Sequence, residues 1–296
     1  MDSETLQKHL QAGKITAEAL QYGRTLIQPG ASVREILDKV EEKIQQLGGT
    51  PAFPAQISLN EFAAHCCSDL NDKIILQNQV VKLDVGVHID GFIADSAITV
   101  DLSGKYGDLL KASQEALNNA LKIIRPGITL GEIGKTIHET ITSYGFSPVK
   151  NLSGHGLGKY DIHAQPSVPN YDNRNENALG EGMIIAIEPF ASTGAGIVEE
   201  SSPATVFTLV NESNIRDPIT RNILKEIRTY QGLPFAKRWL ERKFGTPKTN
   251  FALRTLIKND CLISHPPLFD KNRGIVSQAE HSVIVKEKPI VFTRIN

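Results

Sequence analysis

Two apolar stretches with the composition of strands lie next to each other, at residues 80–89 and 92–102, and only Asp90 and Gly91 separate them. An Asp-Gly pair between two such runs favours a hairpin with a two-residue turn. The sequence therefore predicts an antiparallel hairpin here, with Asp90 as a turn residue. Two later stretches are also expected to form strands, “GMIIAIEPF” at 182–190 and “QAEHSVIVKE” at 278–287.

The segment “LIQPGASVREI” at residues 26–36 returns as “IIRPGITLGEI” at 123–133, 97 positions later. Each copy predicts a helix that ends before Pro-Gly, followed by a second, amphipathic helix. We expect two similar halves related by a pseudo-twofold axis, with a site in the cleft between them. Chance recurrence is the alternative. The expected capping boxes of the second helices are Ser32 with Glu35 and Thr129 with Glu132.

A basic segment lies between residues 216 and 258, where eleven Lys or Arg face three acids. Within it, “RNILKEIRTY” and “FAKRWLERKF” have the pattern of amphipathic helices. The segment therefore predicts a helical, basic insertion that interrupts the second half.

The composition and charge of the chain indicate which classes of protein it can belong to. The chain has 296 residues, of which 40% are hydrophobic, so it can bury a large core. A net charge of −1 does not point to DNA or a membrane, and the N-terminus lacks an apolar leader. Three cysteines, including the vicinal pair Cys66-Cys67, form no disulfide framework. We expect a cytoplasmic protein.

The predicted hairpin places two acids on one face, because Gly86 lies opposite Asp95 and Ala97 lies opposite Asp84. As diagonal neighbours, the acids would have Cα atoms roughly 7–8 Å apart, and Gly86 would leave room beside them. Two converging carboxylates repel each other and resist burial unless a cation or a shared proton intervenes. The alternative is two unrelated acids on an exposed edge.

Three later residues are candidates for the same site. His155 lies between glycines in “SGHGLG”, and Glu188 and Glu280 are acids on the predicted apolar strands. With Asp84 and Asp95 they make four carboxylates and one imidazole, whose charge of −4 would balance two divalent cations. The set favours a dinuclear metal site, which is suited to hydrolysis.

The ordered set Asp84, Asp95, His155, Glu188 and Glu280 resembles the metal ligands of the methionine aminopeptidases. This family shares the pita-bread fold with prolidase and aminopeptidase P, which usually carry a large domain before the first Asp, whereas 83 residues precede Asp84 here. The blocks “AFPAQISLNEFAAH”, “AIEPFASTG”, “LPFAKRWL” and “HPPLFD” are similar to the type II subclass. The absence of a long charged N-terminal extension resembles the archaeal form.

The resemblance implies an α+β pita-bread (creatinase/aminopeptidase) fold with pseudo-twofold duplicated halves, plus a small helical, winged-helix-like insertion. Residues 1–195 and 272–296 would form the catalytic domain and 196–271 the insertion.

The resemblance also implies a role for each candidate ligand. Asp84 would bind one ion and His155 the other, while Asp95 and Glu280 would bridge both. Glu188 would bind metal and act as general base. The expected cofactors are two divalent cations per chain, with Co, Mn, Fe and Zn all admissible.

Five further residues match family positions around the substrate. The two non-ligand histidines, His65 and His163, would position the scissile peptide and stabilise its tetrahedral intermediate. Phe53, Ile162 and Phe190 would line the pocket for the methionine side chain.

The implied activity is removal of the initiator methionine from nascent polypeptides when the second residue is small. The resemblance also implies a monomer. The basic segment itself suggests docking at the ribosome through residues 216–258, and the alternative is a basic helix face that is only solvated. The alternatives are an X-Pro aminopeptidase or prolidase-like hydrolase, and a non-catalytic pita-bread protein that binds ribosomes or RNA.

The chain departs from the family pattern after His65, where Cys66-Cys67-Ser68 replaces Tyr-Thr-Pro. We expect buried, inert cysteines, the alternative being thiols that bind stray metal or oxidise. No site role is expected for the remaining histidines: His9 and His138 on helices, His88 beside the hairpin, His265 in a loop, and His281 on the strand face opposite Glu280.

Overall fold

The computed structural model describes residues 2–201 and 203–294. Residues 1 and 295–296 of the predicted catalytic domain, and position 202 of the predicted insertion, lie outside the described residues. No helix in the described part of the chain has the length and apolar character needed to cross a bilayer.

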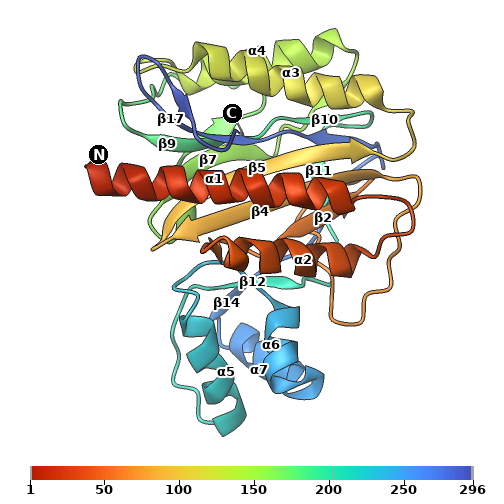
Figure 1. Cartoon of the computed structure of the whole chain (residues 1–296), viewed down its shortest axis with the longest axis vertical. Coiled ribbons are helices and arrows are strands. Elements are labelled where there is room, and N and C mark those ends of the chain that lie inside the picture. Colours follow the sequence, from red (N-terminus) through yellow and green to blue (C-terminus); the bar gives the residue numbers. More distant parts are fainter. Residues whose placement is uncertain (1, 202, 295–296) are drawn as a thin grey trace.

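The first half is a sheet covered on one face by two helices, α1 (Ser3–Leu26) and α2 (Val33–Gln46) (Figure 1). Its strand order is β1-β4-β2, with β5 paired to β4. Leu83 and Val85 of β4 pack with Leu37 of α2 in the core under the helices. Alternate residues of β4, including Asp84, therefore face the other way. The strands are β1 (Thr50–Pro51), β2 (Gln56–Leu59), β3 (Phe62–Ala64), β4 (Val80–Ile89) and β5 (Phe92–Asp101).

The predicted hairpin is confirmed, with its register. Gly86 pairs with Asp95 and Asp84 pairs with Ala97. Asp90 and Gly91 form the turn with φ of 52° and 87°. Two successive positive φ values suit Asp-Gly, because Asp tolerates the left-handed region and glycine has no Cβ.

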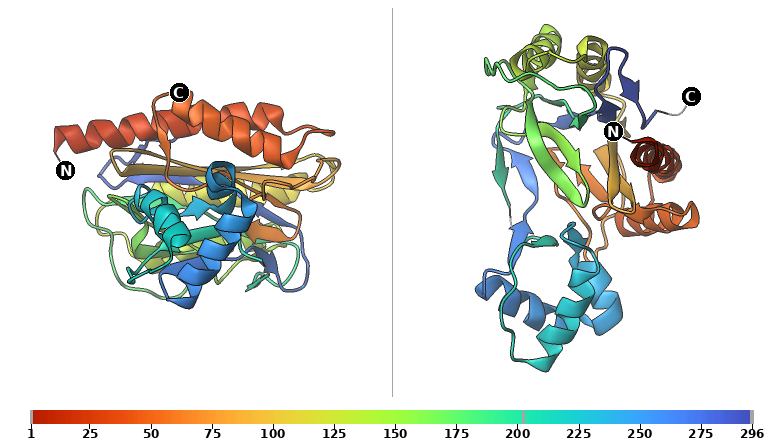
Figure 2. Two further views of the ribbon diagram at one scale, coloured as in Figure 1. Left: turned by 90° about the horizontal axis from the view of Figure 1, so that it is seen from below. Right: turned by 90° about the vertical axis from the view of Figure 1, so that its left-hand side faces the viewer.

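The second half places two helices against two sheets, ordered β18-β17-β9-β7-β8 and β16-β10-β6. In two further views, α1 and α2 lie on one outer side of the strands, and the helices of the basic segment project from one end (Figure 2). The elements are α3 (Gly107–Ile123), α4 (Leu130–Ser143), β6 (Ser147–Pro148), β7 (Ser153–Gly158), β8 (Asp161–Pro169), β9 (Ile184–Ile187), β10 (Phe190–Ser192), β16 (Val276–Gln278), β17 (His281–Ile284) and β18 (Ile290–Val291).

The predicted repeat is confirmed, because α1 and α3, α2 and α4, and β1 and β6 end at positions 97 residues apart. Equivalent isolated bridges join Ser32 to Ile75 and Thr129 to Ala178. The predicted capping box is complete at Thr129, where side chain and backbone bonds with Glu132 run both ways. At Ser32 the prediction of a capping box is wrong. The Ser32 hydroxyl accepts a hydrogen bond from the Glu35 N–H, but no Glu side chain among the described residues returns a bond to the Ser32 backbone.

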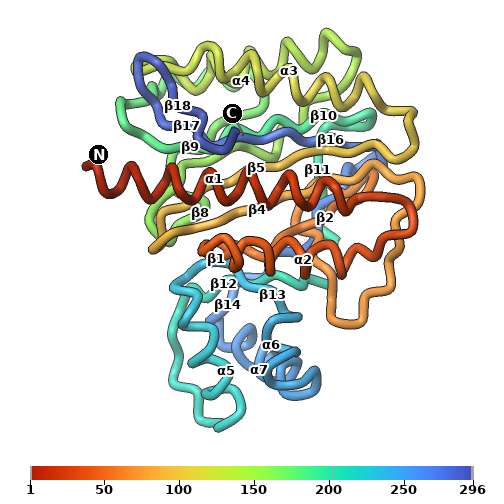
Figure 3. The backbone as a smooth tube through the Cα atoms, viewed as in Figure 1, coloured from red at the N-terminus to blue at the C-terminus, as the bar shows by residue number. Residues whose placement is uncertain are grey.

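The two halves meet along β5, which runs beside β16 and β17 (Figure 3). The Asp95 N–H donates to Ser282 Oγ, and this hydroxyl donates to the Asp95 carbonyl, both at 2.8 Å. Buried Lys82, on the same face of β4 as Asp84, donates from Nζ to the carbonyls of Asn60 and Val276 at 2.9 Å each. These bonds fix the hairpin against the chain that leads to Glu280.

The basic segment and the strands on either side of it form a small unit with its own core, in which α5–α7 pack on the sheet β13-β12-β14. The predicted helices in “RNILKEIRTY” and “FAKRWLERKF” are confirmed as α5 and α6. The domain boundaries at 196 and 271 stay a prediction. The elements are β11 (Val198–Glu200), β12 (Val206–Leu209), α5 (Pro218–Arg228), β13 (Phe235–Ala236), α6 (Lys237–Phe244), α7 (Thr246–Lys258), β14 (Leu262–His265) and β15 (Leu268–Asp270).

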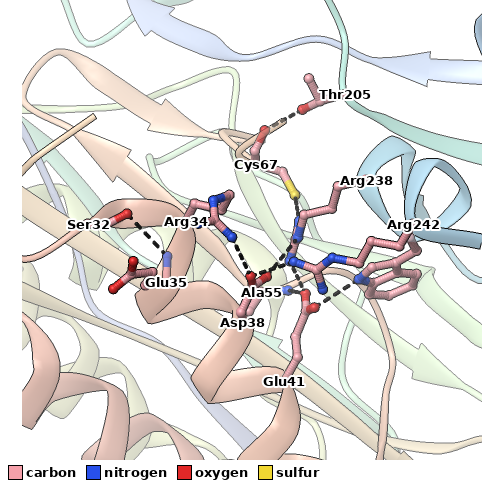
Figure 4. Close-up of polar contacts among 11 residues, drawn as sticks. Ser32, Arg34, Glu35, Asp38, Glu41, Ala55, Cys67, Thr205, Arg238 and Arg242 are labelled. Atoms are coloured by element: carbon pink, nitrogen blue, oxygen red, sulfur yellow. Dashed lines mark hydrogen bonds and ion pairs between the residues drawn. The ribbon is translucent and has the colours of Figure 1, made fainter. Parts of the chain in front are cut away.

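A buried ion cluster anchors this unit to α2 (Figure 4). Arg238 of α6 has 0% of its side chain exposed and forms ion pairs with Glu41 and Asp38 of α2. The Trp239 indole N–H donates to Glu41 Oε2 at 2.8 Å, and Arg238 also donates to Cys67 Sγ. A buried guanidinium requires such partners, so the cluster fixes one orientation of α6.

Candidate metal centre

A cavity of about 360 Å³ lies between the two halves, and Val206 of β12 and His265 of β14 also line it. Residues from both predicted repeats reach it, as the duplication suggested. All ten residues proposed for the site from the sequence line this cavity: Phe53, His65, Asp84, Asp95, His155, Ile162, His163, Glu188, Phe190 and Glu280.

Three of the four acids, Asp95, Glu188 and Glu280, lie near His155. Its Nε2 lies 3.7 Å from Asp95 Oδ2 and 3.5 Å from Glu188 Oε1. One possible ligand atom each from Asp95, His155 and Glu280 lies within 4.8 Å of the others. Glu188 and Glu280 were expected on strands, but each lies in a break, the first between β9 and β10 and the second between β16 and β17.

The protonation of the acids reflects their crowding. Burial raises the pKa of Asp84 to about 7. Burial, and then repulsion from the neighbouring carboxylates, raises the pKa values of Asp95, Glu188 and Glu280 well above their ordinary range. Four such groups repel each other strongly unless protons or cations intervene.

The local chain exposes one nitrogen of His155 to the acids. Its Nδ1 contacts the Gly156 carbonyl at 3.2 Å, which fixes the proton on Nδ1 and leaves Nε2 free to bind a cation. Burial lowers the pKa of His155 to about 3, so the ring is neutral. The flanking glycines are required, because a Cβ at position 154 would lie 2.3 Å from the Ala186 carbonyl oxygen.

The donor set fits divalent cations. Asp84 Oδ1, Asp95 Oδ1 and Glu280 Oε1 are buried and have no hydrogen-bond partner in the part of the chain that the structure describes. Buried polar atoms normally have hydrogen-bond partners, so three unpartnered oxygens in one cavity with a free imidazole nitrogen indicate a site for cations. Oxygen donors with one imidazole suit divalent first-row ions.

Gln278 was missed by the reasoning from sequence. Its Nε2 donates to Glu280 Oε2 at 3.3 Å and lies 3.5 Å from Glu188 Oε2. It stands two residues before Glu280, and strand periodicity puts positions i and i+2 on one face. That spacing was the signal that could have found it.

An apolar pocket adjoins the acids. Phe53, Ile162 and Phe190 are buried at its wall. The expectation that Gly86 leaves room for the two Asp was wrong: the room is filled by the Phe53 ring, and a Cβ at position 86 would lie 2.1 Å from Phe53 Cε1. Gly86 thus serves the apolar pocket.

The non-ligand histidines lie beside the acids. The His163 ring centroid is 4.8 Å from that of His155. His65 has a φ of 62°, and its backbone N–H donates to Gln56 Oε1 at 2.8 Å. A non-glycine residue in this region is strained, and such strain is often found at functional sites.

His265 corrects an expectation. It was assigned to a loop without a site role, but it ends β14 and lines the cavity. Its ring centroid lies 5.7 Å from that of His65, in an edge-to-face arrangement. The remaining histidines outside the proposed site do not line the cavity.

The vicinal cysteines are free thiols. Cys67 is buried and Cys66 is partly buried. Burial raises their pKa values to about 12 and about 11, which disfavours the reactive thiolate. These directions agree with the expected inert role.

The fold and the donor set together define a metallopeptidase. Residues 7–216 match the metallopeptidase family M24. The methionine aminopeptidase of Methanocaldococcus jannaschii is 42% identical over 295 residues, which cover 99% of both chains. The chain therefore belongs to metallopeptidase family M24, and within it to the methionine aminopeptidases.

Solved structures confirm the pita-bread fold. A methionine aminopeptidase from Thermotoga maritima matches with a TM-score of 0.74 and 23% identity, over 100% of this chain and 98% of that chain. A thermophilic Arx1 matches with a TM-score of 0.86 and 16% identity, over 99% of this chain and 91% of that chain. At these identities the likeness concerns the fold alone.

Proposed function

We propose that this protein removes the initiator methionine from nascent polypeptides whose second residue is small, by metal-dependent hydrolysis of the first peptide bond. One observation supports this most directly: buried carboxylate oxygens without hydrogen-bond partners in the described residues line the same cavity as His155 and the apolar side chains Phe53, Ile162 and Phe190. The pocket suits a thioether side chain, which adapts to aromatic and aliphatic walls.

The proposed cofactors are two divalent cations, with Co, Mn, Fe and Zn as candidates. Asp84 would hold one and His155 the other, with Asp95 and Glu280 between them and Glu188 as a further ligand. When bound, such ions polarise a carbonyl and lower the pKa of a water molecule.

The residues of the chain would perform the remaining steps. Glu188 takes a proton from the attacking water and passes it to the leaving amine as the C–N bond breaks. His163 and His65 donate hydrogen bonds that hold the scissile peptide and stabilise the developing oxyanion. Phe53, Ile162 and Phe190 bind the methionine side chain and exclude water from it.

Peptide cleavage tests the proposal. We expect metal-loaded protein to release methionine from Met-Ala-Ser at least about tenfold faster than from Met-Asp-Ser. Equal release, or none from Met-Ala-Ser, would contradict the proposed activity. Faster cleavage of Ala-Pro would favour the X-Pro peptidase alternative, and ribosome binding without any cleavage would favour the non-catalytic one.

Reconstitution tests the cofactors. Protein prepared without oxygen and stripped by a chelator should lose activity and regain it on addition of single ions. A titration that saturates at two ions per chain supports the dinuclear site, and saturation at one contradicts it.

We further propose that residues 196–271 form the insertion, and that the protein is a cytoplasmic monomer that docks on the ribosome through the basic segment. Five of the eleven basic side chains already form ion pairs with acids. Those without an ion pair among residues 2–201 and 203–294 are Arg216, Arg221, Lys225, Lys248, Arg254 and Lys258.

Co-sedimentation with ribosomes tests the docking. Binding should weaken with salt, because neutralised phosphates release counterions. Substitution of both Lys248 and Lys258 by Glu should weaken ribosome binding further. The same substitutions at exposed Lys105, in the loop before α3, and at exposed Lys122, on α3, should not weaken it. Binding that ignores salt and both reversals would contradict docking through the insertion.

A further inference from the structure

The strand β14, which follows the basic segment, carries His265 into the cavity. In the antiparallel pair of β12 and β14, His265 lies opposite Val206, and both side chains line the cavity. Thr208 stands two residues after Val206 and so shares its face. The pairing of β12 with β14 therefore decides where the imidazole points.

A hydrogen bond fixes the ring of His265. The His265 Nε2 lies 2.8 Å from Oγ1 of Thr208, which is on the neighbouring strand β12. Diagonal pairs of this kind are within reach on one sheet face.

His65 is the neighbour that needs such a contact. It is held at φ 62°, and its Nδ1 is buried without a hydrogen-bond partner in the described part of the chain. The His65 ring packs edge-to-face against His265, with ring centroids 5.7 Å apart, and it also contacts the backbone of the next residue, Pro266. Edge-to-face pairs prefer defined ring angles, so they restrict rotation about the side-chain bonds.

Both rings are neutral near pH 7, which makes the contact attractive. Burial, together with the proximity of the other imidazoles, lowers the pKa values of His65 and His265 to about 4 each. Two protonated rings at this distance would repel each other.

We propose that His265 is a positioning residue for His65, so that β14, the strand that follows the basic segment, directly completes the catalytic cavity. The inference rests on the proposed function, in which His65 holds the scissile peptide. A ring that turns away from its productive angle loses its hydrogen bond to the substrate, although substrate binding in the apolar pocket is unchanged.

Kinetics on Met-Ala-Ser provide the first test. We expect His265→Ala to lower kcat by about tenfold or more, since small misplacements of catalytic groups are costly, with less than about a threefold change in KM. His265→Phe keeps the aromatic edge and should recover part of kcat. Ser264→Ala, on the opposite face of β14, is the matched control and should behave as wild type.

A double-mutant cycle separates positioning from general damage. If His265 acts through His65, His265→Ala should have little further effect in a His65→Ala background, because coupled residues are not additive. Additive losses would overturn the proposal, as would a rise in KM at unchanged kcat.

A spectroscopic readout keeps this test independent of turnover. In metal-free protein labelled with ¹⁵N-histidine, the ring signals of His65, assigned through His65→Gln, should shift or broaden in His265→Ala and stay in place in Ser264→Ala. Unshifted signals would overturn the positioning role. If wild type releases no methionine, the proposed function fails, and these signals still decide whether His265 positions His65.

Discussion

The buried carboxyl of Asp84 shows how a single residue links the metal site to stability. Its pKa is raised from 3.8 to about 7, first by burial. A carboxyl with a raised pKa in the folded state contributes stability below its unfolded pKa and loses that contribution as the pH rises through the folded value. The metal-free protein should therefore lose stability from this group between about pH 4 and pH 7.

Asp84→Asn tests this sign. The amide has no charge to bury, so we expect the metal-free variant to exceed the melting temperature of wild type by less at pH 5 than at pH 8, where the gain should be about 3 °C or more. Calorimetry of chelator-treated protein at both pH values measures the difference.

Asp101→Asn is the opposite control. Burial alone would raise the pKa of Asp101, but hydrogen bonds from Ser103 and Tyr106 outweigh it and the pKa is lowered. This substitution should lower the melting temperature at pH 8. A lower melting temperature at pH 8 in both variants would contradict the assignment of a raised pKa to Asp84.

Glu280→Gln separates ligand loss from misfolding. The amide keeps the volume of the side chain but not its charge, so we expect a loss of activity of at least about 100-fold with the fold retained. Activity, bound metal and circular dichroism measured on one preparation check this. Glu200→Gln, an exposed acid on β11, should change none of the three, and full activity of Glu280→Gln would refute the ligand assignment.

At the scale of elements, the repeat supplies a matched pair of helix caps. The Thr129 hydroxyl and backbone exchange bonds with Glu132, whereas Ser32 only accepts from the N–H of Glu35 at 3.4 Å. We expect Thr129→Ala to lower the free energy of unfolding by about 1 kcal/mol and Ser32→Ala by less than about half of that. Denaturant titrations of both variants measure this, and equal losses would contradict it.

The hairpin was predictable because its signal is local, and the repeat was predictable because the same motif returns in register 97 positions later. Asp90-Gly91 fixes the turn, and the period of two then fixes which residues face Asp95. His265 was not predictable in this way, because its direction depends on pairing with Val206, 59 positions earlier. Gln278 carried a local signal, its spacing from Glu280. It was missed because the search for ligands relied on acids on apolar strands, and an amide carries no charge. The resemblance supplied the roles of His65 and His163, which the residues alone did not indicate.

At the scale of the whole molecule, the basic segment is joined to the first half by buried charge. Arg238 is fully buried against Glu41, and Glu41 Oε1 also accepts from the Ala55 N–H at 3.1 Å. Ala55 precedes Gln56, whose side chain holds the backbone of His65. The ion cluster therefore supports both the docking of α6 and the chain that leads to the cavity.

Arg238→Met tests this connection. Removal of one partner leaves Glu41 buried without its cation, so we expect a loss of about 3–5 kcal/mol in the free energy of unfolding, together with reduced turnover below the melting transition. Arg228→Ala is the matched control, because Arg228 is 47% exposed in its pair with Glu212 and should cost less than about 1 kcal/mol. Denaturant titrations and peptide cleavage on both variants measure the two effects. Equal stability losses in the two variants, or full turnover in Arg238→Met, would show that the buried cluster does not support the cavity.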